Sequence, residues 1–335
     1  MRGDRGEPIL AIHELHHEFL ERAGNGKGRR IQALRGVSLD LEKGECMGLV
    51  GESGSGKTTL ARAILRLIQP TRGSVLFRGK DVLTMGRREL REYRKGVQIV
   101  FQDPFGSLNP RLRAGQMLEE ILLVHQGSLS APARKDRVEE LLSLVGLPPE
   151  VALRYPHQFS GGQRQRLGIA RALSVQPEVL VLDEPVSALD LSVQAQILNL
   201  LADLQRSLGL TYLLITHDLS VLRQVADRVG VFYLGKMVEI GPTGGVFEEP
   251  LHPYTRGLMA AAIQPEEDAD DIGGWGLLPG EPPSPADPPT GCAFHPRCPH
   301  PSKDRECVAG TPVLEPPDRG RKVACWKVRE HLTCP

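Results

Sequence analysis

Aromatic residues, an excess of charge of either sign and long apolar runs are all scarce in this sequence. Aromatic side chains make up 4% of the 335 residues, which leaves few surfaces on which single-stranded bases could stack. The formal net charge is zero, so the whole chain has no general attraction for a phosphate backbone. No stretch approaches the roughly 20 apolar residues that cross a bilayer. We therefore expect no nucleic-acid partner and no membrane-spanning segment.

The N-terminal residues 1–8 are charged and lack the apolar run of a secretion signal. Together with the absence of a spanning segment, this predicts a cytoplasmic protein. Any membrane role is then expected to come through partner proteins.

Cysteine is nearly absent before the C-terminal part of the chain. Five of the six cysteines lie within residues 292–335, and in a reducing compartment such clustering favours metal binding over disulfides. The remaining one, Cys46, lies in an apolar run and is interpreted as a packing residue. Cys334, one residue from the end of the sequence, is interpreted as a spare thiol.

The hydrophobic pattern predicts an α/β fold. Strands are expected at residues 31–35, 37–41, 46–50, 97–101, 179–182 and 212–215, with turns at Gly36 and Gly44-Glu45. Helices are expected from Thr58 to near Pro70, and over 138–145, 163–175 and 193–208. The order strand, helix, strand over 179–215 is that of a βαβ unit. It indicates a parallel core interrupted by a helical insertion.

Residues 265–320 are crowded with proline and glycine. Proline removes backbone donors and breaks regular elements, so no long helix or central strand is expected there. The segment is either a linker or a small domain that needs a staple.

The segment 51–58, Gly-Glu-Ser-Gly-Ser-Gly-Lys-Thr, matches the phosphate-binding P-loop pattern and lies between a predicted strand and a predicted helix. Glycines let backbone N–H groups wrap the phosphates, and the helix N-terminus adds partial positive charge. Lys57 is expected at the β- and γ-phosphates and the Thr58 hydroxyl on Mg²⁺. The expected nucleotide contacts are Gly51, Ser53, Gly54, Ser55, Gly56, Lys57, Thr58 and Thr59.

An acidic pair follows the apolar strand 179–182. The carboxyl end of a parallel strand is where ligands bind in such sheets. Asp183 is therefore expected to hold Mg²⁺ through water, and Glu184 to polarise the attacking water. An acidic pair alone is often only a turn, and its pairing with a P-loop favours the catalytic interpretation.

Further motifs carry a family resemblance. Phe159-Ser-Gly-Gly-Gln163 resembles the signature of ATP-binding-cassette (ABC) ATPases, and Gln102, Ser187-Ala-Leu-Asp190 and His217 are similar to the family's Q-loop, D-loop and switch histidine. The motifs occur in the family's order over roughly residues 10–245. The resemblance implies a RecA-like P-loop core with a helical ABC subdomain at about 106–176, within an ATPase domain of residues 1–262.

The resemblance also implies roles for these residues. Two chains of such ATPases pair head to tail, so Ser160, Gly161, Gly162 and Gln163 are expected to contact ATP held by the partner. Gln102 is expected to sense Mg²⁺ and the membrane partner, and His217 to face the γ-phosphate. Phe19 is expected to stack on adenine, with an ordinary packing role as the alternative.

Three finer segments, 104–110, 155–166 and 252–255, look like the oligopeptide/dipeptide importer branch, whose relatives also carry nickel or glutathione. The branch implies two transmembrane permeases, an external solute-binding protein and a second ABC ATPase, for which a different chain is expected. It places the chain peripherally on the cytoplasmic face of the membrane.

The C-terminal extension, residues 263–335, resembles that of the same branch. Its thiols follow the spacing Cys292-x5-Cys298-x8-Cys307-x17-Cys325, which lacks the paired spacing of common zinc sites. Four thiolates suit either Zn²⁺ or an iron–sulfur cluster. Some relatives with this extension hold a [4Fe–4S] cluster, so the resemblance favours the cluster over Zn²⁺. Unliganded thiols are the third possibility, and His295 or His300 could replace a cysteine in a zinc site.

Two other functions compete with transport. A soluble ABC ATPase of translation or DNA repair usually has two cassettes or long coiled-coil insertions, and this sequence has neither. A regulatory module that binds ATP without hydrolysing it would typically lack the catalytic Glu or His, and both are present.

Overall fold

The computed structural model describes residues 7–22, 28–103, 106, 108–263, 278–316 and 320–328. The expectations for Cys334 and for part of the 104–110 motif therefore lie outside the described residues. The chain divides into two compact units. The first contains Met1–Leu41, Cys46–Leu83 and Thr216–Pro335, and the second contains Glu42–Glu45 and Thr84–Ile215.

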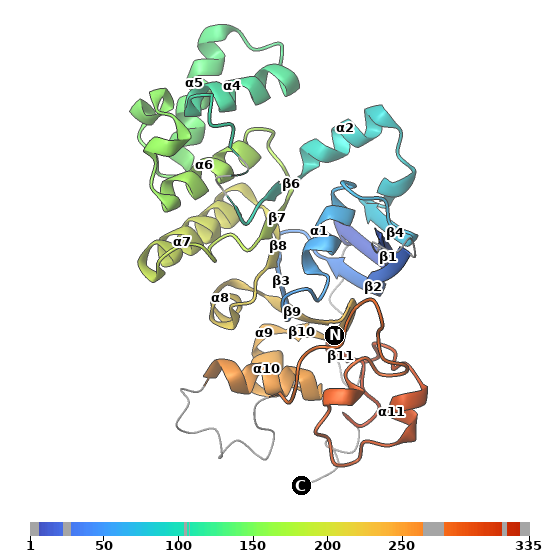
Figure 1. The fold of residues 1–335 in the computed structure, drawn as a ribbon. Coiled ribbons are helices and arrows are strands. Elements are labelled where there is room, and N and C mark those ends of the chain that lie inside the picture. The colour runs from blue at the N-terminus through green and yellow to red at the C-terminus, as the bar shows by residue number, and fades with distance from the viewer. Residues whose placement is uncertain are drawn as a thin grey trace. The chain divides into compact units, whose positions relative to one another are not determined.

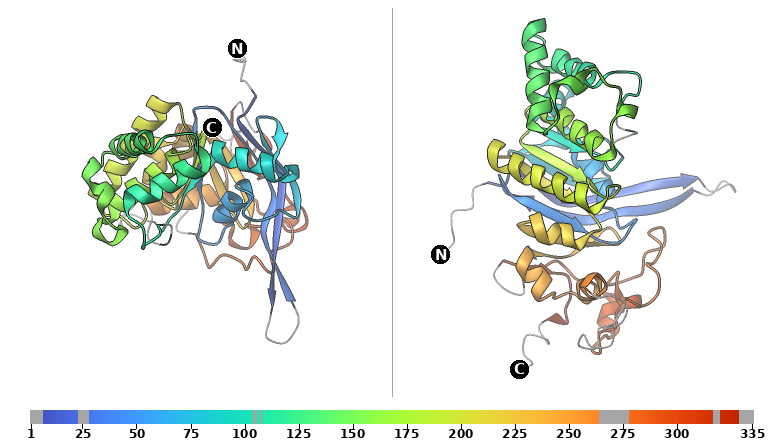
Figure 2. Two further views of the ribbon diagram at one scale, coloured as in Figure 1. Left: turned by 90° about the horizontal axis from the view of Figure 1, so that it is seen from above. Right: turned by 90° about the vertical axis from the view of Figure 1, so that its left-hand side faces the viewer.

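The first unit contains an antiparallel sheet with the strand order β2-β1-β4-β5 (Figure 1). Its strands are β1 (Leu10–Arg22), β2 (Gly28–Leu41), β4 (Arg72–Phe77) and β5 (Lys80–Asp81). Strands β1 and β2 form a long ribbon that projects beyond their neighbours (Figure 2). The predicted turn at Gly36 is wrong. Leu15 pairs with Val37 and His16 with Arg35, so Gly36 is accommodated as a bulge at φ 84° inside one continuous strand.

A second run of strands in this unit has the order β11-β10-β9-β3. The predicted strand 46–50 is confirmed as β3 (Cys46–Val50), which is buried throughout and pairs in parallel with β9 (Arg228–Tyr233). Cys46 is 1% exposed, in agreement with its packing role. Antiparallel β10 (Lys236–Pro242) and the short β11 (Lys322–Val323) complete the run.

Helix α1 (Lys57–Ile64) follows the P-loop and is shorter than predicted. Arg66 has φ 50°, a left-handed conformation that an α-helix cannot continue, so the helix stops well before Pro70. The other helices of the first unit are α8 (Leu219–Val225), α9 (Thr243–Glu248), α10 (Pro253–Ile263), the 3₁₀ turn η4 (His295–Arg297) and α11 (Arg305–Ala309).

The second unit contains the parallel strands β8 (Thr211–Ile215), β7 (Val179–Asp183) and β6 (Val97–Val100), in that order. Among its described residues lie the α-helices α2 (Arg87–Gly96), α4 (Ala114–His125), α5 (Ala131–Leu144), α6 (Gly161–Leu173) and α7 (Leu191–Leu208). The predicted strands and the βαβ order are confirmed, as are the helices within α5, α6 and α7. The predicted helical subdomain contains α4, α5 and α6, and its bounds stay a prediction.

The C-terminal extension packs against β10. Val323 pairs with Glu239, and Leu251, Val323 and Val328 form a small apolar cluster. Within residues 278–316 and 320–328, α11 with five residues is the longest helix, as the proline content predicts. Among the helices that the structure describes, none is long and apolar enough to cross a membrane.

A buried polar junction connects β10 to α10. The Glu239 carboxylate accepts hydrogen bonds from the backbone N–H groups of Leu251 and His252 at 3.0 and 2.9 Å. The His252 ring is 1% exposed, and its Nδ1 accepts the Tyr254 N–H at 3.0 Å. Burial lowers the pKa of His252 to about 3, so the ring stays neutral in the folded protein.

This junction predicts acid sensitivity of the fold. Below about pH 6.5 an unfolded chain protonates His252 while the folded chain does not, so stability is lost as the pH falls toward the folded pKa. At pH 5.5 the loss from this group is about 1.4 kcal/mol. Urea unfolding at pH 7.5 and 5.5 should show that loss in the wild type. The total loss should be smaller by that amount in His252→Asn, whose side-chain oxygen can still accept from Tyr254. Equal losses in both proteins would contradict the assignment.

Candidate functional site

The phosphate loop closes around its own lysine. Lys57 is 6% exposed, and its Nζ donates to the carbonyl oxygens of Gly51 and Glu52 at 2.7 and 3.0 Å, and to Ser55 Oγ at 3.3 Å. These three acceptors are uncharged, so they do not neutralise the ammonium, which can attract an anion. The sequence-predicted residues Ser53, Gly54 and Thr58 are exposed, whereas Gly56 and Thr59 are half-buried.

Two glycines of this loop are required by close backbone contacts. A Cβ on Gly51 would lie 2.1 Å from the carbonyl oxygen of Phe232, and one on Gly56 would lie 2.4 Å from that of Ala33. Gly56 also has φ 112° and is the N-cap of α1. Any other residue at either position would displace the loop from β9 or β2.

A hydrogen bond between this loop and α10 was not predicted from the sequence. The Tyr254 hydroxyl accepts the Glu52 backbone N–H at 3.0 Å, and Tyr254 itself is fully buried. The segment 252–255 had signalled only a resemblance to the importer branch. The structure gives it a physical role, because Tyr254 holds the backbone of the phosphate loop.

In the second unit, the acidic pair stands at the end of β7. Asp183 is the buried last residue of the strand, and Glu184 follows it with φ 49°, an uncommon conformation for a residue with a side chain. Hydrogen bonds from the Glu184 N–H to Ile215 and from Ser187 to the Glu184 carbonyl hold this turn. The strained backbone is typical of functional sites, where it costs on the order of 1–3 kcal/mol.

The structure brings Gln102 and Glu184 together. Gln102 Nε2 donates to Glu184 Oε2 at 2.8 Å, although the two residues are far apart in the sequence. In this arrangement the Q-loop amide occupies one oxygen of the carboxylate that is expected to polarise water. The two residues therefore form one polar pair next to Asp183.

The signature segment forms a capped helix start. Ser160 is the N-cap of α6, with its Oγ accepting the Gln163 N–H at 3.3 Å and its own N–H bonded to the Gln163 side chain at 3.1 Å. This capping box presents an exposed helix N-terminus, which suits an anion. Ser160 and Gly161 are exposed, as contact with a second chain requires, whereas Gly162 is buried.

The remaining predicted residues lie in the first unit. His217 is exposed and follows β8 along the chain, just before Asp218, which caps α8. Phe19 lies on β1, is 38% exposed and contacts the His17 ring edge-on at 4.5 Å. Lys57, Thr58 and His217 thus belong to one unit, and Asp183, Glu184, Gln102 and the signature to the other. Their assembly around one nucleotide stays a prediction.

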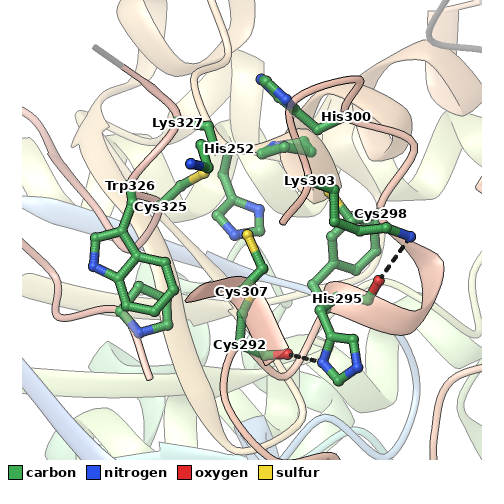
Figure 3. A pocket seen from close by; sticks show the side chains of 13 residues that line it. His252, Cys292, His295, Cys298, His300, Lys303, Cys307, Cys325, Trp326 and Lys327 are labelled. Atoms are coloured by element: carbon green, nitrogen blue, oxygen red, sulfur yellow. Dashed lines mark hydrogen bonds between the residues drawn. The ribbon is translucent and has the colours of Figure 1, made fainter. Parts of the chain in front are cut away.

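The four cysteines of the extension line one pocket (Figure 3). Its lining also includes His252, Phe294, His295, His300, Lys303, Trp326 and Lys327. Burial raises the pKa of Cys292 to about 11 and that of Cys325 to about 12, so these thiols are protonated at neutral pH.

The fit of a metal to this pocket is partial. Four cysteines are a suitable donor set for Zn²⁺ or an iron–sulfur cluster. However, among the described residues no group of three or more His, Cys, Asp or Glu side chains is arranged to hold a metal ion. The cavity of about 20 Å³ has room for one water-sized occupant, less than a cluster of four irons and four sulfides needs. Neither the expected [4Fe–4S] cluster nor the alternative Zn²⁺ is therefore supported by this arrangement.

Two glycines of α6 allow a matched test of the signature helix. A Cβ on Gly162 would lie 2.3 Å from Val193 Cγ1 of α7, whereas one on Gly168 meets nothing within 4 Å. Gly162→Ala should destabilise the protein by roughly 1–3 kcal/mol through overpacking, and Gly168→Ala should stabilise it by up to about 1 kcal/mol. Urea unfolding measures both changes. Adding Val193→Ala should recover part of the Gly162→Ala loss, and an unimproved double variant would contradict the contact.

Comparison with known proteins agrees with this geometry. Residues 34–187 match the family described as "ABC transporter", and residues 238–307 match the "Oligopeptide/dipeptide transporter, C-terminal region". The chain is 47% identical to the putative oligopeptide transport ATP-binding protein YkfD of Bacillus subtilis over 97% of both chains. It is 49% identical to the oligopeptide transport ATP-binding protein AppF of the same organism, over 88% of this chain and 90% of AppF.

A solved structure shows the same fold. The ATP-binding cassette MJ0796, in a dimeric post-hydrolysis state bound to ADP and Pi, aligns with a TM-score of 0.63 at 30% identity. The alignment covers 70% of this chain and 99% of that cassette. The chain therefore belongs to the ATP-binding-cassette family of ATPases, in the branch that carries the oligopeptide/dipeptide transporter C-terminal region.

Proposed function

We propose that this chain hydrolyses ATP to power the import of oligopeptides or dipeptides through a membrane complex. The observation that carries the proposal is the joint match of cassette and C-terminal region, with relatives named for peptide transport along nearly the whole chain. The zero net charge does not favour the alternative of a soluble ABC ATPase in translation or DNA repair.

ATP binding is proposed to begin when Lys57 exchanges its hydrogen bonds to loop carbonyls for bonds to phosphate oxygens. Its Nζ now donates to loop carbonyls, and phosphate oxygens carry far more negative charge than those carbonyls do. Thr58, Asp183 and Gln102 supply oxygen donors of the kind that Mg²⁺ prefers, and the ion neutralises developing phosphate charge. Glu184, once separated from Gln102, orients the attacking water, and His217 contacts the γ-phosphate.

The exposed N-terminus of α6 supports a paired arrangement. The exposed helix start at Ser160 and Gly161 is suited to the γ-phosphate bound by a second cassette, and the similar cassette MJ0796 is dimeric. ATP then joins the two subunits, and hydrolysis releases them. Proposed partners are a second, different ABC ATPase, two permeases and an external solute-binding protein, with this chain on the cytoplasmic face of the membrane.

The variant Glu184→Gln tests this mechanism. It should still bind Mg-ATP while turnover falls by about 10²–10⁴-fold, because it retains the shape of the side chain and loses the base. Glu150→Gln, at an exposed position on a 3₁₀ turn, is the matched control and should turn over normally. Turnover is measured as phosphate release. An unchanged rate in Glu184→Gln would refute the assigned role.

The same variant identifies the partners. Purification with Mg-ATP from detergent-solubilised membranes should retain the closed complex, since ATP stabilises it. Mass spectrometry is expected to find two multi-spanning permeases and a second cassette. Recovery of ribosomal or DNA-repair proteins without any membrane protein would instead favour the alternative function.

We also propose that the cysteine pocket binds a metal, as a [4Fe–4S] cluster or as Zn²⁺. The convergence of four thiols from distant positions supports this proposal. Any occupant requires the thiols to approach one another and to lose their protons. The small cavity favours a single ion, and the family resemblance favours the cluster.

Metal analysis of anaerobically purified protein distinguishes a [4Fe–4S] cluster from Zn²⁺. We expect either four irons with acid-labile sulfide, or one zinc, per chain. Cys298→Ser should lower the content, while Cys46→Ala, which changes a core cysteine in β3, should leave it unchanged. Wild-type protein free of iron and zinc would refute the proposal.

A further inference from the structure

The guanidinium of Arg297 donates hydrogen bonds from all three of its nitrogens. Arg297 ends the η4 turn and is 6% exposed. Its Nη1 and Nη2 donate to the two carboxylate oxygens of Glu52 at 2.9 and 3.1 Å, and its Nε donates to the Pro279 carbonyl at 2.9 Å. A bidentate pair of this kind fixes both distance and orientation.

Glu52 lies within the phosphate loop and is held at three points. Its carboxylate is bound by Arg297, its N–H by the Tyr254 hydroxyl, and its carbonyl oxygen by Lys57 Nζ at 3.0 Å. Glu52 therefore accepts a hydrogen bond from the phosphate-binding lysine and is also bound by Arg297 of the C-terminal extension. The hydrogen bonds that Arg297 donates to the loop go to the carboxylate of Glu52.

The charges of Glu52 and Arg297 affect how strongly the loop attracts ATP. Glu52 places a carboxylate, 27% exposed, in a loop that must receive a polyanion. Like charges at such short range disfavour each other, and partial burial weakens the screening by salt. Arg297 cancels this charge, so the loop keeps the net attraction supplied by Lys57.

Aromatic packing holds the turn that carries Arg297. Phe294 is 1% exposed, and its ring lies 5.3 Å from that of Tyr233 and 5.5 Å from that of Tyr254. The Arg297 guanidinium also lies 5.9 Å from the Tyr233 ring centroid. The extension therefore reaches the loop through a buried, closely packed contact.

We propose that Arg297 is a positioning residue of the ATP site, which orients and neutralises Glu52 so that the phosphate loop can accept ATP. The proposal rests on the assignment of the phosphate loop to ATP binding. It gives the C-terminal extension a part in nucleotide affinity that is separate from its cysteines.

The proposal is tested on the full-length protein by ATP titration and by measuring the KM and kcat of phosphate release. Arg297→Met should raise KM and the ATP dissociation constant on the order of tenfold, with a smaller change in kcat. The double variant Glu52→Gln/Arg297→Met should return KM toward the wild-type value, because the unpaired carboxylate is gone. A purely structural role for Arg297 predicts no such rescue.

Arg321→Met is the matched control. Arg321 is 8% exposed and also belongs to the extension, but its guanidinium donates to the Glu249 carbonyl at 2.9 Å and pairs with the Glu249 carboxylate at 3.4 Å, outside the phosphate loop. It should leave KM unchanged. Equal effects of Arg297→Met and Arg321→Met, or failure of Glu52→Gln to rescue, would overturn the proposal. Wild-type protein that does not bind ATP would refute the loop assignment instead.

Discussion

The phosphate loop depends on the close approach of Gly51 to the Phe232 carbonyl oxygen. Because a Cβ there would lie 2.1 Å from that oxygen, only glycine lets the loop start so near β9. The loop can then turn its Gly51 and Glu52 carbonyls toward Lys57. A lysine held in place by neutral acceptors is positioned before ATP arrives, which lowers the ordering cost of binding.

In the second unit, the carboxylates of Asp183 and Glu184 are positioned by the end of a buried strand and by the turn that follows it. The buried strand β7 delivers Asp183 with little freedom, whereas Glu184 adopts φ 49° and relies on hydrogen bonds to Ile215 and Ser187. A residue in this conformation is held by its surroundings rather than by its own preference. Its pairing with Gln102 then joins the Q-loop to the end of β7, so that movement of either residue affects the other.

The sequence predicted the parts of the fold whose signals are local. Short apolar runs identified β3, β7 and β8, and the glycine pattern identified the loop before α1. Strand β1 was missed because Glu14 and His16 interrupt its alternation around register shifts, and Gly36 resembled a turn because a bulge uses the same backbone freedom. The Arg297–Glu52 pair was missed because it joins residues 245 positions apart without any local signal.

The extension is attached by polar contacts as well as by apolar packing. Its small cluster around Leu251, Val323 and Val328 is accompanied by bonds from Arg297 to Glu52, from Arg321 to Glu249 and from Gln32 to Pro285. Buried ion pairs add little net stability, but they make one docking arrangement much better than its neighbours. Since one of these contacts is a residue of the phosphate loop, docking of the extension and binding of ATP are coupled. Linkage requires the coupling to be reciprocal, so a nucleotide that favours this loop geometry also favours the docked extension.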